Sequence, residues 1–297
     1  MDTFTHIVAI TLILSSTGNM LLIPFGVLGA VIIDIDVGYT RIARRRPSNY
    51  LLFHGGINHT LLGATVLSAI GVGVAFLLLS IGLLPASLSK PGILAALLAA
   101  LAGAYLHLFL DWLPGPGTPL LYPWTEKKYG LSVYPMSFYF LITLLSLASL
   151  VIILLGGLTT TLSIVYGALF TGITLIGLGL KGYVSTKAPG TSYPTLNPLQ
   201  WIVIREEDSS YSVRVYAIGR GVVQHLSFKK YKDITPAEAR VYDSLVEVRR
   251  HRYFSYIPTV EKRGEEIVFH DPVREQGLIA YPPWYPSVTL PARITEP

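Results

Sequence analysis

Histidine and aspartate residues recur through the first 111 positions of the chain, at the edges of apolar segments. The set comprises His6, Asp34, Asp36, His54, His59, His107 and Asp111. Imidazole nitrogens and carboxylate oxygens are ligands that proteins offer to borderline divalent metals such as zinc. Ionisable side chains at or within hydrocarbon are costly unless an ion or a partner neutralises them. The pattern therefore indicates a metal site at a membrane.

The clearest of these motifs is His107-Leu-Phe-Leu-Asp111, at the end of an apolar run that begins at Gly92. A run of that length is typical of a membrane-spanning helix. His107 and Asp111 stand four apart, so they share one helix face with their Cβ atoms about 5–6 Å apart. A hydrogen bond between the two at a helix end is the alternative, and the pair alone does not separate the two interpretations.

Two further motifs flank the same region. Asp34-Ile-Asp36 follows directly on an apolar run, where an acidic turn that ends a helix is the alternative to ligation. His54-Gly-Gly-Ile-Asn-His59 precedes the next apolar run, and its two glycines allow backbone turns that larger residues resist. Two histidines this close favour metal binding over plain interfacial polarity.

Composition places the chain among integral membrane proteins. Apolar residues make up 51% of the sequence, charged residues only 14%, and mean hydropathy is +0.51. Two short apolar runs near the N-terminus, 7–14 and 20–33, predict a helical hairpin that dips into the membrane, or one broken segment, because neither reaches about 20 residues. The N-terminus lacks the basic region and the cleavage site of a secretory signal. Long apolar runs predict spanning helices at 61–84, 92–111, 136–155 and 158–180.

The distribution of charge divides the chain into two parts. Charged residues are scarce between 61 and 180 and abundant from 205 to 296. The predicted fold is an all-α polytopic membrane domain, with four long spanning helices and a short N-terminal helical hairpin, followed by a small α+β soluble domain. We place the membrane domain at residues 1–185, a linker rich in Pro, Ser and Thr at 186–198, and the soluble domain at 199–297.

The soluble part carries signals for both strands and helices. Apolar and β-branched residues predict strands at 201–205 and 211–216, and shorter runs predict others, including one at 278–281. Thr235-Pro-Ala-Glu238 has the pattern of a capping box, so we expect a helix from there to about residue 250. The histidines of this part are isolated, and we interpret them as ordinary polar residues of the fold: His225, His251 and His270.

Topology follows from the basic residues. The net charge of +5 is concentrated in clusters, chiefly Arg41 and Arg44–Arg46. The positive-inside rule places this loop in the cytoplasm, an interpretation we favour over a nucleic-acid patch. The chain then crosses outward at 61–84 and returns at 92–111, which puts all seven His and Asp residues, and the soluble domain, on the cytoplasmic side. The sequence contains no cysteine, so disulfides and thiolate metal sites are excluded.

Taken as a set, the motifs resemble those of the YdjM-type membrane-bound, metal-dependent hydrolases. The matching pieces cover residues 1 to about 185 and are Asp2-x-x-Thr5-His6, Asp34-x-Asp36, His54-x4-His59-Thr60, His107-x3-Asp111 and Gly117…Tyr122-Pro123. That family is remotely similar to zinc-dependent phospholipase C and S1/P1 nuclease, helical proteins that hold zinc and cleave phosphate esters. The chain departs from the family at Ile33, where a Pro often stands, and at Gly55, where an Arg commonly stands. A phosphate-orienting role therefore cannot be carried over to position 55.

The resemblance implies a membrane-embedded hydrolase with a divalent metal, expected to be zinc. Its ligands would be His6, Asp34, His59, His107 and Asp111, with His54 as a sixth candidate. We expect Asp36 to be the general base, because the first Asp of the pair is the expected ligand. The expected substrate is a phosphoester of a membrane lipid or another amphiphile at the cytoplasmic face, and no nucleic acid is expected.

Two other functions are compatible with the same residues. The first is a non-enzymatic membrane scaffold with a structural metal and a soluble tail that recruits a protein partner. An ion transporter is disfavoured, because it requires a polar path through the bilayer, and the runs 61–84 and 136–180 offer almost no polar residues for one.

Overall fold

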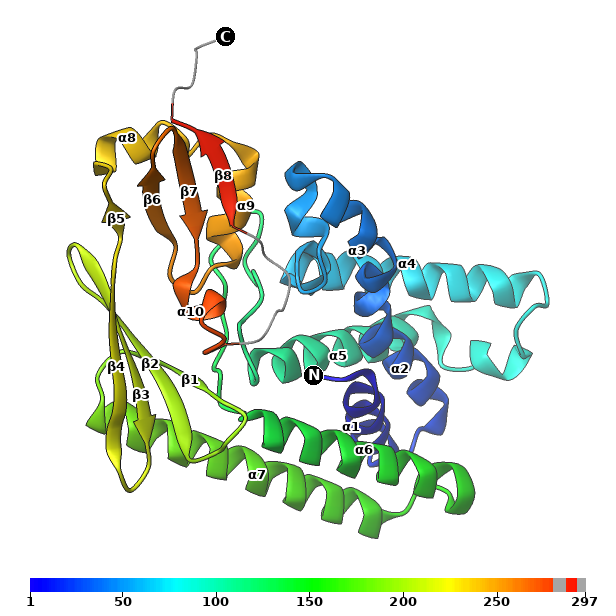
Figure 1. Ribbon diagram of the computed structural model, residues 1–297. Coiled ribbons are helices and arrows are strands. Elements are labelled where there is room, and N and C mark those ends of the chain that lie inside the picture. Colours follow the sequence, from blue (N-terminus) through cyan, green and yellow to red (C-terminus); the bar gives the residue numbers. More distant parts are fainter. Residues whose placement is uncertain (280–286, 293–297) are drawn as a thin grey trace. The chain divides into compact units, whose positions relative to one another are not determined.

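The structure is a computed structural model that describes residues 1–279 and 287–292 of the 297-residue chain (Figure 1). The chain divides into two compact units, of which the first comprises Met1–Arg44 and Leu51–Gly179 and the second Arg45–Tyr50 and Leu180–Pro297. The first unit is helical, and the second contains two β-sheets.

The helices of the first unit are joined by short 3-10 turns. The α-helices are α1 (Thr3–Ser15), α2 (Ile23–Ile32), α3 (Asp36–Arg45), α4 (Leu61–Ser80), α5 (Gly92–Trp112), α6 (Met136–Gly156) and α7 (Thr160–Lys187), the last of which continues into the second unit. The 3-10 turns are η1 (Met20–Leu22), η2 (Ile33–Ile35), η3 (Pro47–Leu52), η4 (Ile57–His59) and η5 (Ala86–Ser89).

Five helical segments of the described chain are long and apolar enough to cross a membrane. They are Met20–Ala43, Leu61–Ser80, Gly92–Trp112, Met136–Gly156 and Thr160–Lys187. The predicted fold class is confirmed. The part of the chain that the structure describes has five helical segments of spanning length, where four long spans and a short hairpin were expected. The difference arises at Asp34 and Asp36, which do not end the first long segment. Helical turns continue through both residues, because histidine partners described below offset the cost of their charges.

Polar contacts hold α1, which is too short to span, against α6 and α7. Asp2 caps α1 by accepting a hydrogen bond from the Thr5 N–H at 3.0 Å, and it accepts another from the Thr143 hydroxyl of α6 at 2.8 Å. The Thr5 hydroxyl lies 3.0 Å from that of Ser146, which lies 3.0 Å from the Tyr166 hydroxyl of α7. Such hydrogen bonds help to hold helices together in lipid, where the hydrophobic effect does not drive them together.

Small residues let α2 and α5 approach backbone to backbone. A Cβ atom on Gly29 would lie 1.9 Å from the carbonyl oxygen of Ala100, and one on Gly103 would lie 2.0 Å from the carbonyl oxygen of Gly26. Neither position has room for a side chain. Contacts through small residues are typical of closely packed helices in membranes. The approach places α2 directly against the helix that carries His107.

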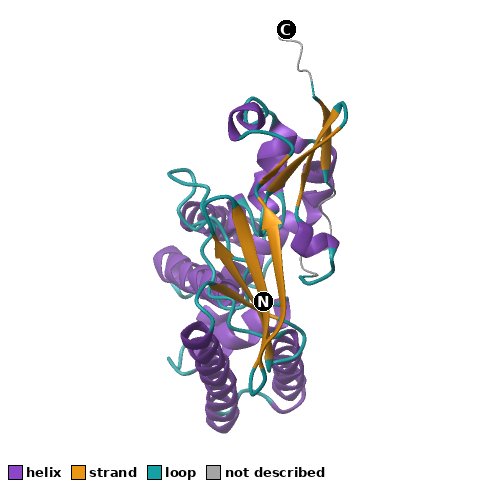
Figure 2. Cartoon of the chain, turned by 60° about the vertical axis from the view of Figure 1, so that its left-hand side comes forward, coloured by secondary structure: helices purple, strands orange, loops and turns teal. Residues whose placement is uncertain are grey.

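The second unit contains two four-stranded sheets among its described residues (Figure 2). The first is antiparallel and consists of β1 (Thr191–Pro194), β2 (Gln200–Glu206), β3 (Ser210–Ala217) and β4 (Gly221–Lys229), in that order. The second consists of β5 (Tyr231–Lys232), β6 (Thr259–Arg263), β7 (Glu266–His270) and β8 (Val288–Pro291), with β5 and β6 parallel. The unit also contains α8 (Pro236–Arg240), α9 (Val246–Phe254) and α10 (Pro272–Glu275). The α+β class predicted for the soluble part is confirmed.

The predicted capping box is present, but the helix that it starts is short. The Thr235 hydroxyl accepts from the Glu238 N–H at 3.2 Å, and the Glu238 carboxylate accepts from the Thr235 N–H at 2.8 Å. The chain leaves the helical path between α8 and α9 instead of forming one helix to residue 250. The turn between them buries Tyr242, whose ring centroid lies 6.0 Å from that of Phe269 in the second sheet.

Two other predicted segments are described only in part or differ in structure. Leu278 and Ile279 are not in a strand, and the rest of the strand predicted at 278–281 lies outside the described residues. The segment predicted as a linker, 186–198, contains the end of α7 and all of β1. The predicted domain boundaries themselves remain a prediction.

Candidate metal centre

Separate elements of the first unit bring the seven His and Asp residues together. They are His6 on α1, Asp34 in η2, Asp36 at the start of α3, His54 in the loop before α4, His59 in η4, and His107 and Asp111 on α5. The three histidines on α1, η4 and α5 are fully buried. Residues that are up to 105 positions apart in the sequence thus meet in one cluster.

Four side-chain atoms lie at the centre of this cluster. The Nε2 atoms of His59 and His107 are 3.3 Å apart, and each is 3.3 Å from Oδ2 of Asp111. Oδ1 of Asp34 lies 3.4 Å from the first nitrogen and 3.5 Å from the second. Metal–ligand bonds of 2.0–2.1 Å would place tetrahedral zinc ligands about 3.3–3.4 Å apart. The five distances of this four-atom cluster match the separation of ligands that share one ion, and the structure groups Asp34, His59 and His107 closely enough to hold one.

The outer nitrogen of each central imidazole faces an oxygen atom. Nδ1 of His107 donates a hydrogen bond to the carbonyl oxygen of Ala30 at 2.6 Å, so its Nε2 presents a lone pair to the cluster. Nδ1 of His59 faces Oδ2 of Asp36 at 3.1 Å. Carbonyl and carboxylate partners of this kind hold metal-ligating histidines in place and increase their basicity.

The loop before α4 is held against the end of α2 by backbone geometry and by one amide. Gly55 has a φ of +80°, and its N–H donates to Oδ2 of Asp36 at 3.3 Å. A Cβ atom on Gly56 would lie 2.0 Å from a backbone oxygen of the preceding turn. The side-chain amide of Asn58 donates to the carbonyl oxygen of Ile33 at 3.0 Å. Both glycines of the sequence motif thus occupy positions that larger residues would strain.

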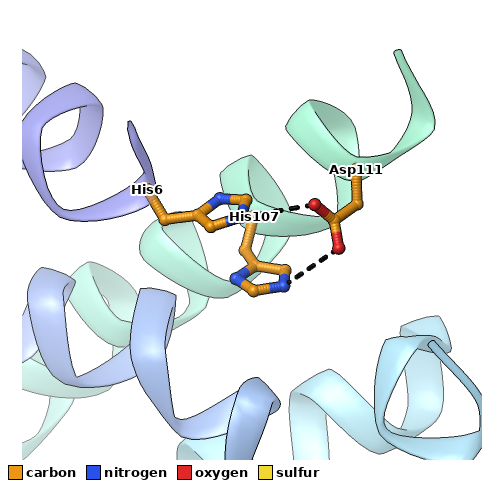
Figure 3. A group of neighbouring side chains, drawn as sticks. All are labelled: His6, His107 and Asp111. Atoms are coloured by element: carbon orange, nitrogen blue, oxygen red, sulfur yellow. Dashed lines mark ion pairs between the residues drawn. The ribbon is translucent and has the colours of Figure 1, made fainter. Parts of the chain in front are cut away.

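The two oxygens of Asp111 face different imidazoles (Figure 3). Oδ2 belongs to the four-atom cluster, while Oδ1 lies 3.2 Å from Nε2 of His6. The His6 and His107 rings stack with their centroids 3.8 Å apart. The α-amino group of Met1 pairs with Oδ1 of Asp111 as well. This carboxylate is therefore placed between the four-atom cluster and a second position beside His6.

Several buried polar atoms of the cluster have no hydrogen-bond partner within the described part of the chain. They are both ring nitrogens of His6, Oδ1 of Asp34 and Nδ1 of His59. The close contacts of these atoms lack hydrogen-bond geometry. An unsatisfied buried polar atom costs about 1–3 kcal/mol. A cation in the cluster would satisfy Oδ1 of Asp34 and Nε2 of His6, which face its other donors, so the donor set fits a metal.

The carboxylates also affect the proton on His59. Burial lowers the pKa of this imidazole, but the carboxylates of Asp111, Asp34 and Asp36 outweigh that effect and hold the pKa well above its usual value. A metal ion that takes the place of this proton would bind more tightly as the pH rises.

Asp36 lies beside the four-atom cluster and contacts two histidines. One of its oxygens is 2.8 Å from Nδ1 of His54, and the other is 3.1 Å from Nδ1 of His59. The Asp36 side chain is 1% exposed, whereas that of His54 is 36% exposed. This position suits an orienting role, and the assignment of Asp36 as the general base stays a prediction.

Three further partners of the site were not predicted from the sequence. The carbonyl oxygen of Ala30 and the N–H of Gly55 are backbone groups. Almost every residue type has them, so the sequence does not reveal their role. Asn58 lies inside the motif that spans 54–59, and its place between two histidines was the available signal.

Comparison with known proteins identifies one family. A family model described as YdjM inner membrane protein matches residues 1–184. No curated protein and no solved structure matches the chain. The matched range contains all seven His and Asp residues of the cluster and ends before β1. The remote similarity to zinc-dependent phospholipase C is not shown by these comparisons.

Proposed function

The chain belongs to the YdjM inner membrane protein family, and on this premise we propose that it is a membrane-embedded, metal-dependent hydrolase. The bond cleaved is a phosphoester of a lipid or another amphiphile. The observation that carries the proposal is the four-atom cluster, whose measured distances of 3.3–3.5 Å match ligands that share one ion. Two imidazoles and two carboxylates suit zinc.

His59, His107, Asp34 and Asp111 would hold the ion. A divalent ion in this place supplies two effects, since it lowers the pKa of a water molecule toward 7 and polarises a phosphoester oxygen. The Asp34 side chain is 16% exposed and is the most exposed of the four, so we place the approach of substrate at this edge. His6 and Oδ1 of Asp111 offer two further donors beside this ion, next to the α-amino group of Met1.

Asp36 and His54 are the residues to which we assign proton movement. Asp36 is buried and holds Nδ1 of His54, while the His54 ring reaches solvent. An imidazole held by a buried carboxylate is suited to accept and return protons. Asp36 then contributes to base catalysis through His54.

An apolar hollow between α2 and α4 supports an amphiphilic substrate. Its volume is about 260 Å³, and its lining includes Phe25, Leu28 and Leu78. At a rise of 1.5 Å per residue, Leu28 lies about 9 Å along the helix from Asp34. An acyl chain that lies in the hollow from Leu78 to Leu28 would have one end directed toward the metal cluster.

The test is a hydrolysis assay on the full-length protein in detergent. Wild-type protein loaded with zinc is expected to cleave a phospholipid in mixed micelles, to lose this activity to a chelator and to regain it with added zinc. His59→Ala is expected to lose the activity, while His225→Ala, a histidine on β4 paired with Ser212, is expected to retain it. Equal activity in the His59 and His225 variants would refute the assignment of the site.

A second candidate function is favoured by the completeness of the four-atom cluster. Four protein ligands fill a tetrahedron, and closed sites are typical of structural ions. The protein would then be a non-enzymatic membrane scaffold whose soluble part binds a partner. In that case the chelator lowers the melting temperature, and metal-loaded protein cleaves no substrate. Cleavage of substrate by the metal-loaded protein would support the hydrolase and rule out the non-enzymatic scaffold.

Substitutions of Asp36 and His54 are expected to separate metal binding from proton transfer. Asp36→Asn is expected to weaken zinc binding about 10- to 100-fold, because it removes the partner that orients His59. His54→Ala is expected to keep zinc affinity within a few-fold and to lower kcat about 100-fold or more, the contribution typical of an acid–base group. Zinc affinity by chelator competition and steady-state kinetics measure the two effects. Equal losses of zinc in both variants would contradict the division of roles.

We further propose that the metal cluster and the second unit face the cytoplasm. Arg41, Arg45 and Arg46 are exposed near the end of the first long span, which favours a cytoplasmic position for this segment. The chain contains no cysteine, so Ser209→Cys in the exposed β2–β3 turn provides a single label site. A membrane-impermeant maleimide is expected to label it only after the cells are opened. Labelling in intact cells would show that the second unit faces the outside of the cell, which contradicts the proposed topology.

A further inference from the structure

Exposed apolar side chains gather at one end of the first sheet. Within the described part of the chain after α7, the large apolar residues that are exposed are Leu196, Leu199, Val222, Val223 and Val241. The first two lie in the loop between β1 and β2, and the next two lie at the start of β4. Only Val241 stands apart, in the turn after α8.

The strand register places the two groups side by side. Gln200, at the start of β2, pairs with Ala217 at the end of β3, and Ala217 pairs with Gly221 at the start of β4. The N–H of Ile218 donates to the carbonyl oxygen of Leu199 at 2.8 Å. The β1–β2 loop and the β3–β4 turn therefore form one apolar sheet end, defined by Leu196, Leu199, Val222 and Val223.

This apolar sheet end lies on the side of the apolar part of α7. Leu180 and Val184 of the helix pack in one cluster with Trp201 at the start of β2. Further along the chain, a Cβ atom on Gly190 would lie 2.7 Å from the carbonyl oxygen of Ile204. β2 thus runs beside α7 in the same direction, and its first residues, with the adjoining loops, lie nearest Leu180.

Leu180 is also the point at which α7 reaches the edge of the hydrocarbon. Thr160 to Leu180 contains no Asp, Glu, Lys or Arg, and Lys181 follows. Twenty residues of helix rise about 30 Å, which is the thickness of the hydrocarbon core. Tyr183 is 43% exposed, at a level where aromatic side chains are enriched in membrane proteins. The apolar sheet end is therefore at the height of the lipid surface.

We propose that the apolar sheet end inserts into the interfacial layer of the bilayer that the helices of this chain span. The apolar faces of membrane-surface segments are buried about 5–10 Å into this layer. Arg220, exposed in the β3–β4 turn, has a long stem that lets its charge reach lipid phosphates while its neighbours contact acyl chains. The lipid contact of α7 thus continues onto the first sheet, independently of any hydrolytic activity.

Spin labels at single cysteines test this contact in the full-length protein. Leu199→Cys and Val223→Cys place a nitroxide on the apolar sheet end, in vesicles of phosphatidylcholine and phosphatidylglycerol. Val241→Cys, an equally apolar and exposed site, and Ser209→Cys, at the opposite end of the sheet, are the controls. The ratio of collisions with oxygen to collisions with a water-soluble nickel chelate is expected to be at least about threefold higher at 199 and 223, because oxygen concentrates in lipid.

A second measurement guards against disturbance by the label. Leu196 is 73% exposed, so Leu196→Cys removes little packing. Bimane at this position is expected to be quenched by brominated lipids, and bimane at 209 is not. Nickel accessibility at 199 and 223 equal to that at 209, or unquenched bimane at 196, would overturn the proposal.

Discussion

Replacement of Asp111 by asparagine is expected to weaken zinc binding by more than about 100-fold, the largest loss typical of changes in outer-shell partners alone. One oxygen of Asp111 lies 3.3 Å from Nε2 of both His59 and His107, and the other lies 3.2 Å from Nε2 of His6. Asparagine keeps the size of the side chain but removes its charge. The variant therefore loses a carboxylate that contacts His6, His59 and His107, without opening a cavity.

Zinc content per chain after dialysis, measured by mass spectrometry, checks this prediction. Asp208→Asn, an exposed carboxylate in the second unit, is the matched control and is expected to retain wild-type zinc. Circular dichroism shows whether Asp111→Asn keeps its helices. A folded Asp111 variant with wild-type zinc content and affinity would remove Asp111 from the metal site.

The second large effect is expected at a residue that contacts no metal. Gly103→Ala is expected to destabilise the protein by about 3 kcal/mol, the upper range for overpacking. Its Cβ atom would lie 2.0 Å from the carbonyl oxygen of Gly26, so α2 must move away from α5. That movement separates the carbonyl oxygen of Ala30 from Nδ1 of His107, and zinc binding falls although every ligand is intact.

Gly73→Ala is the matched control for this substitution. A Cβ atom on Gly73 would meet no atom within 4 Å, and alanine is the better helix former by about 1 kcal/mol. Thermal unfolding in detergent is expected to show a lower melting temperature for Gly103→Ala alone, together with a lower zinc content. If the two variants unfold at the same temperature and hold the same zinc, the close approach of α2 and α5 does not position the site.

Much of the candidate site was predictable from residue types and helical spacing. His107 and Asp111 share a helix face because they stand four residues apart, and the depth of each apolar run places Asp34 and His59 at a similar height. The contact of Ala30 with His107 was not predictable in this way. It depends on the approach of α2 to α5, which is a tertiary consequence of glycines that have no common spacing signal.

The fold shows the same division between local and tertiary causes. Run length predicted the spans after residue 60, since hydrocarbon thickness sets the number of apolar residues. The span through Asp34 and Asp36 was misjudged, because the histidines that offset these charges come 18 or more residues later. In the second unit, β2 and β3 follow from local residue pattern. The turn between α8 and α9 depends on packing against the second sheet.

Anomalous diffraction at the zinc absorption edge, from crystals of the full-length protein grown with zinc, tests the central claim most directly. The predicted result is a peak about 2 Å from Nε2 of His59, Nε2 of His107 and one carboxylate oxygen each of Asp34 and Asp111. A crystal with no peak among these four side chains, or with the side chains turned away from one another, would contradict the existence of the metal centre.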